Sequence, residues 1–232
     1  MISRRAFLGV AGVAMARLKP RPPGVGARGF SRADDLHIER EYDGAFCKLR
    51  VINRGKETIR LDDVIVLDES IDLPSETALY GEGFQMLTQT GGTLASPVDL
   101  SQYTDAKHYR LASTDGARAF YGLLTLSPPR APAHVFAFTS CARFSGRFEI
   151  RASEGRPSRV VAIVDCEGLM LRPGATLPLE ELMVATGDRP MLLDGVAARL
   201  ATSHPPLRTN RPPTGWCSWY CFGSNVTASG AR

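Results

Sequence analysis

Aromatic side chains that could contact a sugar gather near the end of the chain. Its only two tryptophans lie in one segment, Gly215-Trp216-Cys217-Ser218-Trp219-Tyr220. Flat aromatic faces suit the apolar C–H faces of a sugar ring. The tryptophans are three residues apart, so on a strand they would face opposite sides. We expect Trp216, Trp219 and Tyr220 to contact substrate. The alternative, that both tryptophans only fill a core and a domain junction, stays open.

A second concentration of aromatic, glycine and polar residues lies between Leu79 and Leu111, in the stretches 79–87 and 103–110. Loops of this composition often shape binding sites. A long surface loop held in place by its own aromatic side chains would have the same composition. Both interpretations stay open from the residues alone.

Acidic and sulfur-containing residues suggest no further site. We interpret five acidic residues as charge at strand edges and in turns, namely Asp62, Asp63, Asp68, Glu69 and Asp72. The cysteines, at positions 47, 141, 166, 217 and 221, are odd in number and form no CxxC pair. They predict neither a disulfide framework nor a zinc site, and we expect them to be small buried side chains. No metal or organic cofactor is expected.

The elements that would position these residues are mostly strands. Apolar and polar residues alternate from Leu36 onward, and Asp43-Gly44 is typical of a hairpin turn. Strands are expected at 36–42, 46–52, 59–67, 120–126, 135–139, 147–152, 160–165, 169–172 and 179–185. Many strands without helical patterns between them predict a mainly β fold, a large antiparallel sandwich.

One helix is expected over residues 188–204. Asp188 can cap its start, Pro190 suits a first turn, and apolar residues then recur at helical spacing. Pro205 and Pro206 end it. Residues 205–214 are rich in proline, arginine and threonine, which indicates a linker between domains.

The N-terminus differs from the rest in charge. Residues 1–35 hold seven basic and two acidic residues, a charge of +5, so the total of +4 leaves −1 for the remainder. That nearly neutral body does not indicate a basic groove for nucleic acid, and we expect no nucleic-acid partner. Ser3-Arg4-Arg5-Ala6-Phe7-Leu8 and the apolar residues up to Ala16 match a twin-arginine (Tat) export signal. The alternative is a basic N-terminus with a chance apolar run.

We therefore expect a signal at 1–16, a disordered linker at 17–34, and export to the periplasm or medium of a bacterium. The apolar stretch is too short to span a bilayer as a helix, so no stable membrane insertion is expected.

The segment 213–227 resembles the start of the catalytic barrel in α-galactosidases of glycoside hydrolase family 36 and their raffinose-synthase relatives. There, Gly-Trp-Cys-Ser-Trp-Tyr forms the first barrel strand. The stretches 80–87 and 108–110 are similar to the N-terminal supersandwich of that family. The resemblance implies a β-supersandwich domain at 35–187, a linker helix at 188–204, a Pro-rich linker at 205–214 and the start of a truncated (β/α)8 barrel at 215–232.

The same resemblance implies hydrolysis of terminal α-galactosides, with retention, in a full-length parent. Retaining glycosidases need two carboxylates about 5–5.5 Å apart, and in this family both lie on later barrel strands. A whole barrel takes about 250 residues, whereas 18 follow Thr214. The chain alone is expected to be an inactive fragment. The alternative is a non-catalytic accessory or carbohydrate-binding module that docks on a barrel, contributes a loop to the sugar site and helps homo-oligomers form.

Overall fold

A computed structural model describes residues 33–85, 87–109, 111, 116–153 and 156–206, with isolated residues between 209 and 229. The expected signal and most of the linker after it therefore lie outside the described residues. Within them, the chain is mainly β with antiparallel pairing, as the alternation predicted. None of the helices in the described part is long and apolar enough to cross a membrane.

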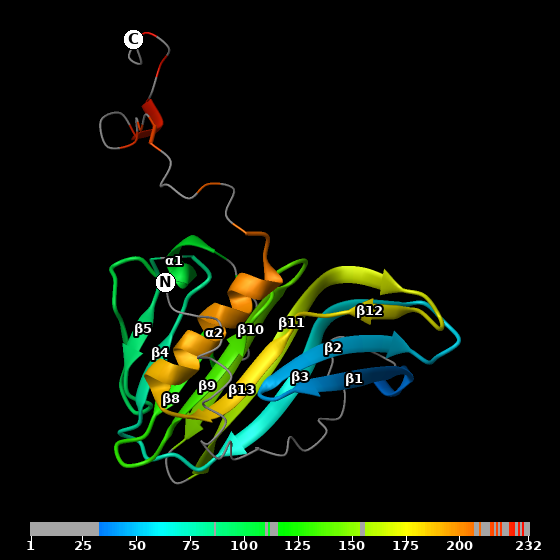
Figure 1. Ribbon diagram of the computed structural model, residues 1–232, viewed down its shortest axis with the longest axis horizontal. Coiled ribbons are helices and arrows are strands. Elements are labelled where there is room, and N and C mark those ends of the chain that lie inside the picture. The colour runs from blue at the N-terminus through cyan, green and yellow to red at the C-terminus, as the bar shows by residue number, and fades with distance from the viewer. Residues whose placement is uncertain are drawn as a thin grey trace.

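Two sheets pack face to face (Figure 1). The described strands of the larger sheet follow the order β1 (Leu36–Asp43), β2 (Phe46–Asn53), β13 (Leu182–Gly187), β9 (Ala133–Phe138), β8 (Leu123–Ser127), β4 (Ala78–Gly81), β5 (Thr90–Gly92) and β6 (Pro97–Asp99), and β12 (Thr176–Pro178) also pairs with β2. The smaller sheet has the order β3 (Ile59–Ile71), β11 (Arg156–Leu171), β10 (Ser145–Ser153) and β7 (Arg118–Tyr121).

The core lies between the sheets because side chains on each strand alternate between its two faces. Phe136 and Phe138 of β9 point into this core and meet Phe148 of β10, with ring centroids 6.1 and 5.0 Å apart. All three rings are buried. The intervening residues of β9, Val135 and Ala137, belong instead to a second apolar cluster on the outer face of the sheet.

The expected hairpin between the first two strands is confirmed. β1 and β2 pair in register from Leu36 opposite Asn53 to Asp43 opposite Phe46. Gly44 has φ +62, the left-handed conformation that a tight hairpin turn needs and that glycine adopts without a side-chain clash.

The single strand expected at 120–126 is wrong, because the chain changes sheets there. β7 ends at Tyr121 and β8 begins at Leu123, and the two strands belong to different sheets. Gly122 between them has φ +73, donates its N–H to Gly146 O (3.0 Å) and accepts from Phe138 N (2.8 Å). The apolar residues on both sides of Gly122 belong to largely buried strands, so the run 120–126 indicates one strand and does not reveal the change of sheet.

The two strands expected at 160–165 and 169–172 are parts of one long strand, β11, which runs beside β3. Its register shifts between Asp165 and Leu169, where Glu167 has φ 55 and Gly168 has φ 77. This irregularity interrupts the alternation, which is why the sequence suggested two strands. Of the next predicted strand, 179–185, only residues 182–185 belong to a strand, β13, because residues 179–181 connect it to β12, which ends at Pro178.

The interpretation of Asp63 as edge or turn charge is wrong. Its carboxylate pairs with the guanidinium of Arg147, which is 2% exposed, at 2.9 Å between Nη1 and Oδ1. Arg147 Nε also donates to Glu149 Oε1 at 3.3 Å. Asp63 therefore neutralises a buried cation, because an unpaired charge in a core costs several kcal/mol. Asp68 keeps the expected surface role, in an exposed pair with Arg159.

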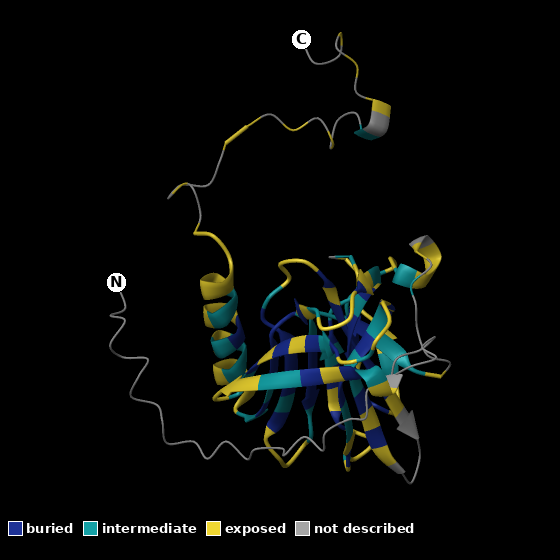
Figure 2. Ribbon diagram, turned by 90° about the vertical axis from the view of Figure 1, so that its right-hand side faces the viewer, coloured by how far each residue is buried: buried dark blue, intermediate teal, exposed yellow. Residues whose placement is uncertain are grey.

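Helix α2 (Arg189–Ser203) covers the outer face of the larger sheet, against β9 and β13 (Figure 1). Asp188 caps it as expected, since its Oδ1 accepts from Met191 N at 3.1 Å. Figure 2 shows that the helix buries the side facing the sheet and exposes the other, and Val196 is its buried residue.

The four cysteines in the described part are free thiols. Cys47 and Cys166 are buried, as expected, whereas Cys141 and Cys217 are exposed. Burial raises the pKa of Cys166 to about 12, so this thiol is protonated and unreactive at neutral pH. Cys221 lies outside the described residues.

Candidate functional site

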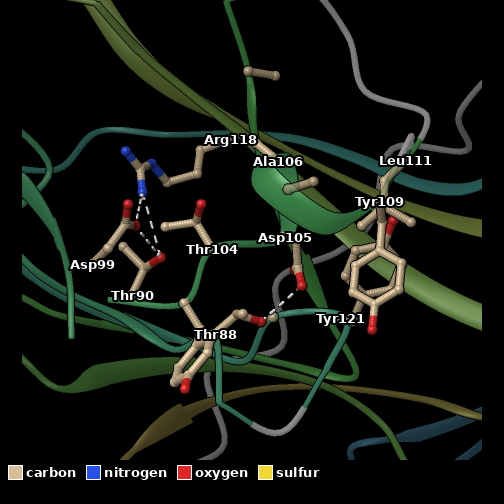
Figure 3. A pocket seen from close by; sticks show the side chains of 14 residues that line it. Thr88, Thr90, Asp99, Thr104, Asp105, Ala106, Tyr109, Leu111, Arg118 and Tyr121 are labelled. Carbon is tan, nitrogen blue, oxygen red and sulfur yellow. Dashed lines mark hydrogen bonds and ion pairs between the residues drawn. The ribbon is translucent and has the colours of Figure 1, made fainter. Parts of the chain in front are cut away.

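A cavity of about 510 Å³ opens where β5 and β6 of the larger sheet meet β7 of the smaller one (Figure 3). This volume is within the range of about 300–1,000 Å³ that small-molecule sites occupy. The loop between β4 and β5 and the short helix α1 (Asp105–His108) complete its walls. Most of the wall thus comes from the segment 79–111, which the sequence marked as a candidate binding loop.

One end of the cavity carries an ion pair. Arg118 Nη1 on β7 donates to Asp99 Oδ1 on β6 at 2.9 Å and approaches Thr90 Oγ1 on β5 at 3.4 Å. Thr90 Oγ1 in turn donates to Asp99 Oδ1 at 3.2 Å. Asp99 and Arg118 keep 45% and 40% of their side chains exposed, so both can reach a ligand. Their formal charges cancel.

The carboxylate of Asp105 holds the loop between β4 and β5. Its Oδ2 accepts from Phe84 N at 2.6 Å, and its Oδ1 accepts from Thr88 Oγ1 at 2.9 Å and from Gln85 N at 3.4 Å. Figure 3 shows the contact between Thr88 and Asp105 near the middle of the cavity. With both oxygens accepting, this side chain serves mainly to shape the wall.

Aromatic rings form the other end. The ring of Phe84 makes edge-on contacts with Tyr109, at 5.2 Å between centroids, and with Tyr121, at 5.3 Å. Tyr109 is 42% exposed, so part of this residue faces solvent at the cavity. Burial raises the pKa of Tyr121, so at neutral pH its hydroxyl is uncharged and can both donate and accept a hydrogen bond.

A second polar cluster lies under the same loop. Glu82 accepts from the hydroxyl of Tyr80 and from Gln89 Nε2, the latter at 3.0 Å. Burial and the Glu82 carboxylate raise the pKa of Tyr80 to about 12. The guanidinium of Arg189, at the start of α2, lies 5.9 Å from the centroid of the Tyr80 ring. The cluster thereby connects the wall of the cavity to the helix that leads toward the C-terminus.

The residues expected to contact substrate are only partly described. Trp216 and Tyr220 lie outside the described residues. Trp219 is described, is 67% exposed and does not line the cavity. The strand expected from residue 215 stays a prediction, because half of it is not described and Gly215, Cys217 and Trp219 are in no strand.

Sequence reasoning missed the partners across the cavity. Arg118 and Tyr121 lie on β7, in the other sheet from Thr90 and Asp99. No local spacing relates β7 to β6, so the ion pair has no signal in the sequence. No group of three or more His, Cys, Asp or Glu side chains in the described part is placed to hold a metal ion.

The arrangement suits binding of an uncharged ligand rich in hydroxyl groups. Adjacent donors and acceptors at the Arg118 end can pair with hydroxyls, and the exposed ring of Tyr109 can cover an apolar face. Both carboxylates among the described lining residues already accept hydrogen bonds from protein groups.

No family model matches the chain, and no curated protein matches it. Three of the solved structures that are similar to it cover about 70% of its length. They are the galactosidase domain of an α-galactosidase–sucrose kinase (TM-score 0.45, 13% identity, 68% of this chain and 23% of that one), an α-galactosidase from Lactobacillus brevis (0.43, 12%, 73% and 23%) and a family 36 α-galactosidase from Geobacillus stearothermophilus (0.39, 12%, 73% and 26%). The chain spans about a quarter of the length of these structures.

Proposed function

We propose that this chain is the N-terminal, non-catalytic β-sandwich module of an α-galactosidase-like glycoside hydrolase. The observation that carries the proposal is the order of parts along the chain. A two-sheet sandwich comes first, helix α2 packs on its outer face, and the segment 215–220 then resembles the first strand of a family 36 barrel. The substrate class of the parent is a terminal α-galactoside.

The attachment of α2 supports a docking role. Val196 packs on the outer face of the larger sheet, and Arg199 forms an ion pair with Glu181 beside β13. The helix is thus fixed to the sandwich near both its middle and its end. A fixed helix sets the direction in which the chain leaves the module at Pro205, which a module that positions a barrel requires.

The use of buried carboxylates supports the non-catalytic assignment. Glu180 is 2% exposed and accepts hydrogen bonds from the backbone N–H groups of Ala142, Arg143 and Phe144 at 2.8–3.1 Å. Retaining hydrolysis needs one carboxylate free to attack and one that can donate a proton, about 5–5.5 Å apart. We therefore place the catalytic pair on a barrel outside this module.

Export through the Tat pathway is part of the proposal. The motif Ser3–Leu8 supports it, and the free buried thiols of Cys47 and Cys166 suit a protein that folds in a reducing cytoplasm before export. Replacing Arg4 and Arg5 together by lysine should retain the protein inside bacterial cells. Unchanged export of that double variant would contradict export through the Tat pathway.

The coding sequence downstream of codon 232 tests the proposal. A continuation, in the same or a shifted frame, that encodes barrel strands bearing aspartates supports it. An unrelated gene at that position contradicts it. Sequencing the DNA downstream of codon 232 needs no folded protein, so the result does not depend on the stability or solubility of the isolated module.

A further inference from the structure

We infer that the cavity between β5, β6 and β7 is a saccharide site in its own right, which takes one neutral sugar ring without help from a barrel. This inference rests on the proposed function, because it assigns the site to a module of a sugar-processing enzyme. It names a binding site that lies wholly within the sandwich.

Charged side chains of the cavity lining discriminate between ligands. Among the described residues that line the cavity, three are charged, and Asp99 and Arg118 neutralise each other at 2.9 Å. Asp105 remains, which leaves one net negative charge among these described residues. A phosphate, a sulfate or a uronic acid would be repelled by it, whereas an uncharged ligand would not. The cavity therefore favours neutral ligands.

The cavity also offers both donors and acceptors of hydrogen bonds. Neighbouring hydroxyls on a sugar ring each donate and accept, so they fit a surface that offers both. Asp99 supplies acceptor oxygens and Arg118 supplies donors. In the described part of the chain only Nη1 of Arg118 is engaged, so Nε and Nη2 can donate to hydroxyls. Thr90 between them adds a hydroxyl group.

The cavity also places an aromatic ring opposite the ion pair. The ring of Tyr109 stands at the opposite end from the ion pair in Figure 3 and is held edge-on by Phe84. A sugar has one face of C–H groups, and an exposed aromatic ring covers such a face well. A ligand that lies between Tyr109 and Asp99 would use both properties at once, which an ion or a purely apolar molecule could not.

The ion pair between Arg118 and Asp99 has an alternative role, which is to hold the two sheets together. Arg118 belongs to the smaller sheet and Asp99 to the larger. The experiment separates the two roles by comparison with another exposed ion pair across strands. Arg159 and Asp68 join β11 to β3, with Nε–Oδ1 at 2.7 Å, away from the cavity. Asp68→Asn is therefore the control for Asp99→Asn.

The test is isothermal titration calorimetry on the full chain with D-galactose, D-glucose, raffinose and D-galacturonate. We expect saturable binding of at least one neutral sugar, at least tenfold weaker binding of galacturonate than of galactose, at least tenfold weakening by Asp99→Asn, and less than twofold change in Asp68→Asn. Absence of binding by every neutral sugar, equal binding of galacturonate, or equal effects of the two variants would overturn the inference.

A second variant leaves the ion pair intact, so that loss of the sugar site can be told apart from misfolding. Tyr109→Ala removes a half-exposed ring without touching Asp99 or Arg118, and we expect tenfold weaker binding with an unchanged melting temperature. Wild-type affinity in this variant would also overturn the inference. None of these outcomes depends on the sequence beyond codon 232, so failure of the sugar site and failure of the proposed function can be told apart.

Discussion

Arg199 of helix α2 and Glu181 beside β13 form a two-point ion pair, with Nε–Oε1 at 2.7 Å and Nη2–Oε2 at 2.6 Å. The Glu181 side chain is 9% exposed and also accepts from Thr139 Oγ1 at 2.7 Å. The guanidinium lies 4.7 Å from the centroid of the Phe46 ring. This contact fixes α2 to the sheet, and with it the direction in which the chain leaves the sandwich.

Arg199→Ala should therefore loosen α2. Because the change leaves a largely buried carboxylate without its cation, we expect the free energy of unfolding to fall by about 2–3 kcal/mol. Chemical denaturation measures this loss. Arg60→Ala is the control, since its pair with Asp62 is exposed, and it should cost less than about 1 kcal/mol. Equal losses in the two variants would refute a special role for Arg199.

Glu180→Gln should destabilise the loop 140–144. One carboxylate oxygen becomes an NH₂ group that faces backbone donors, so at least one buried N–H loses its acceptor. We expect a loss of about 2 kcal/mol in the free energy of unfolding. Glu41→Gln, at an exposed position of β1, should change it by less than about 0.5 kcal/mol. A Glu180 variant as stable as wild type would count against the loop anchor.

Stability should decrease at low pH because of Glu180 and Glu181. Burial alone would raise the pKa of Glu180, but Ser140 and three backbone N–H groups lower it below its ordinary value. Hydrogen bonding from Arg199 lowers the pKa of Glu181. Folded-state pKa values below the unfolded one mean that the unfolded chain binds more protons. Their stabilisation is complete above the unfolded pKa of about 4.3 and is lost as the pH falls through the folded values.

Denaturation of wild type and of Glu180→Gln between pH 6 and pH 3 provides the measurement. The unfolding free energy of the wild type should fall more steeply below about pH 4.3 than that of the variant. If the free energies of unfolding of the two proteins changed with pH in parallel, the pKa of Glu180 would be the same in the folded and unfolded states, which would contradict this prediction.

Two glycine substitutions should act in opposite directions. A Cβ at Gly146 would lie 2.3 Å from Cδ2 of Phe138, whereas a Cβ at Gly195 in α2 would meet nothing within 4 Å. Gly146→Ala should cost about 1–3 kcal/mol of stability through overpacking. Gly195→Ala should add about 1 kcal/mol through helix propensity. Thermal melting of both variants checks this, and a stabilised Gly146→Ala would contradict the packing described here.

The sequence predicted those parts of the fold that are formed by residues close together in the chain. The hairpin at Asp43-Gly44 and the helix capped by Asp188 depend on residues close in sequence, so their patterns are visible there. The change of sheet at Gly122 and the pairing of Asp63 with Arg147, 84 residues apart, depend on tertiary contacts. Such contacts leave no periodic signal.

The candidate site, too, could be predicted from the sequence only in part. The composition of residues 79–111 indicated a possible binding loop, and the cavity lies there. Its partner Arg118 lies on a strand of the other sheet, which only the folded arrangement brings to Asp99. The aromatic segment 215–220 has a strong sequence signal, and its contact with substrate stays a prediction.

Trp216→Ala in a full-length parent tests that prediction. If Trp216 contacts sugar or fills the start of a barrel, the variant should show at least tenfold weaker sugar affinity or a lower melting temperature. Glu41→Gln, at an exposed position of β1, is a comparison that leaves both the segment 215–220 and the cavity intact. Normal stability together with normal kinetics in Trp216→Ala would exclude any role for it.

The most direct measurement is turnover of a chromogenic aryl α-galactoside by two purified proteins, the 232-residue chain and the longer product encoded when reading continues past codon 232. We expect no turnover above background for the chain alone and clear hydrolysis, with retained anomeric configuration, for the longer protein. Turnover by the 232-residue chain itself, or an inactive longer protein that folds, would contradict it.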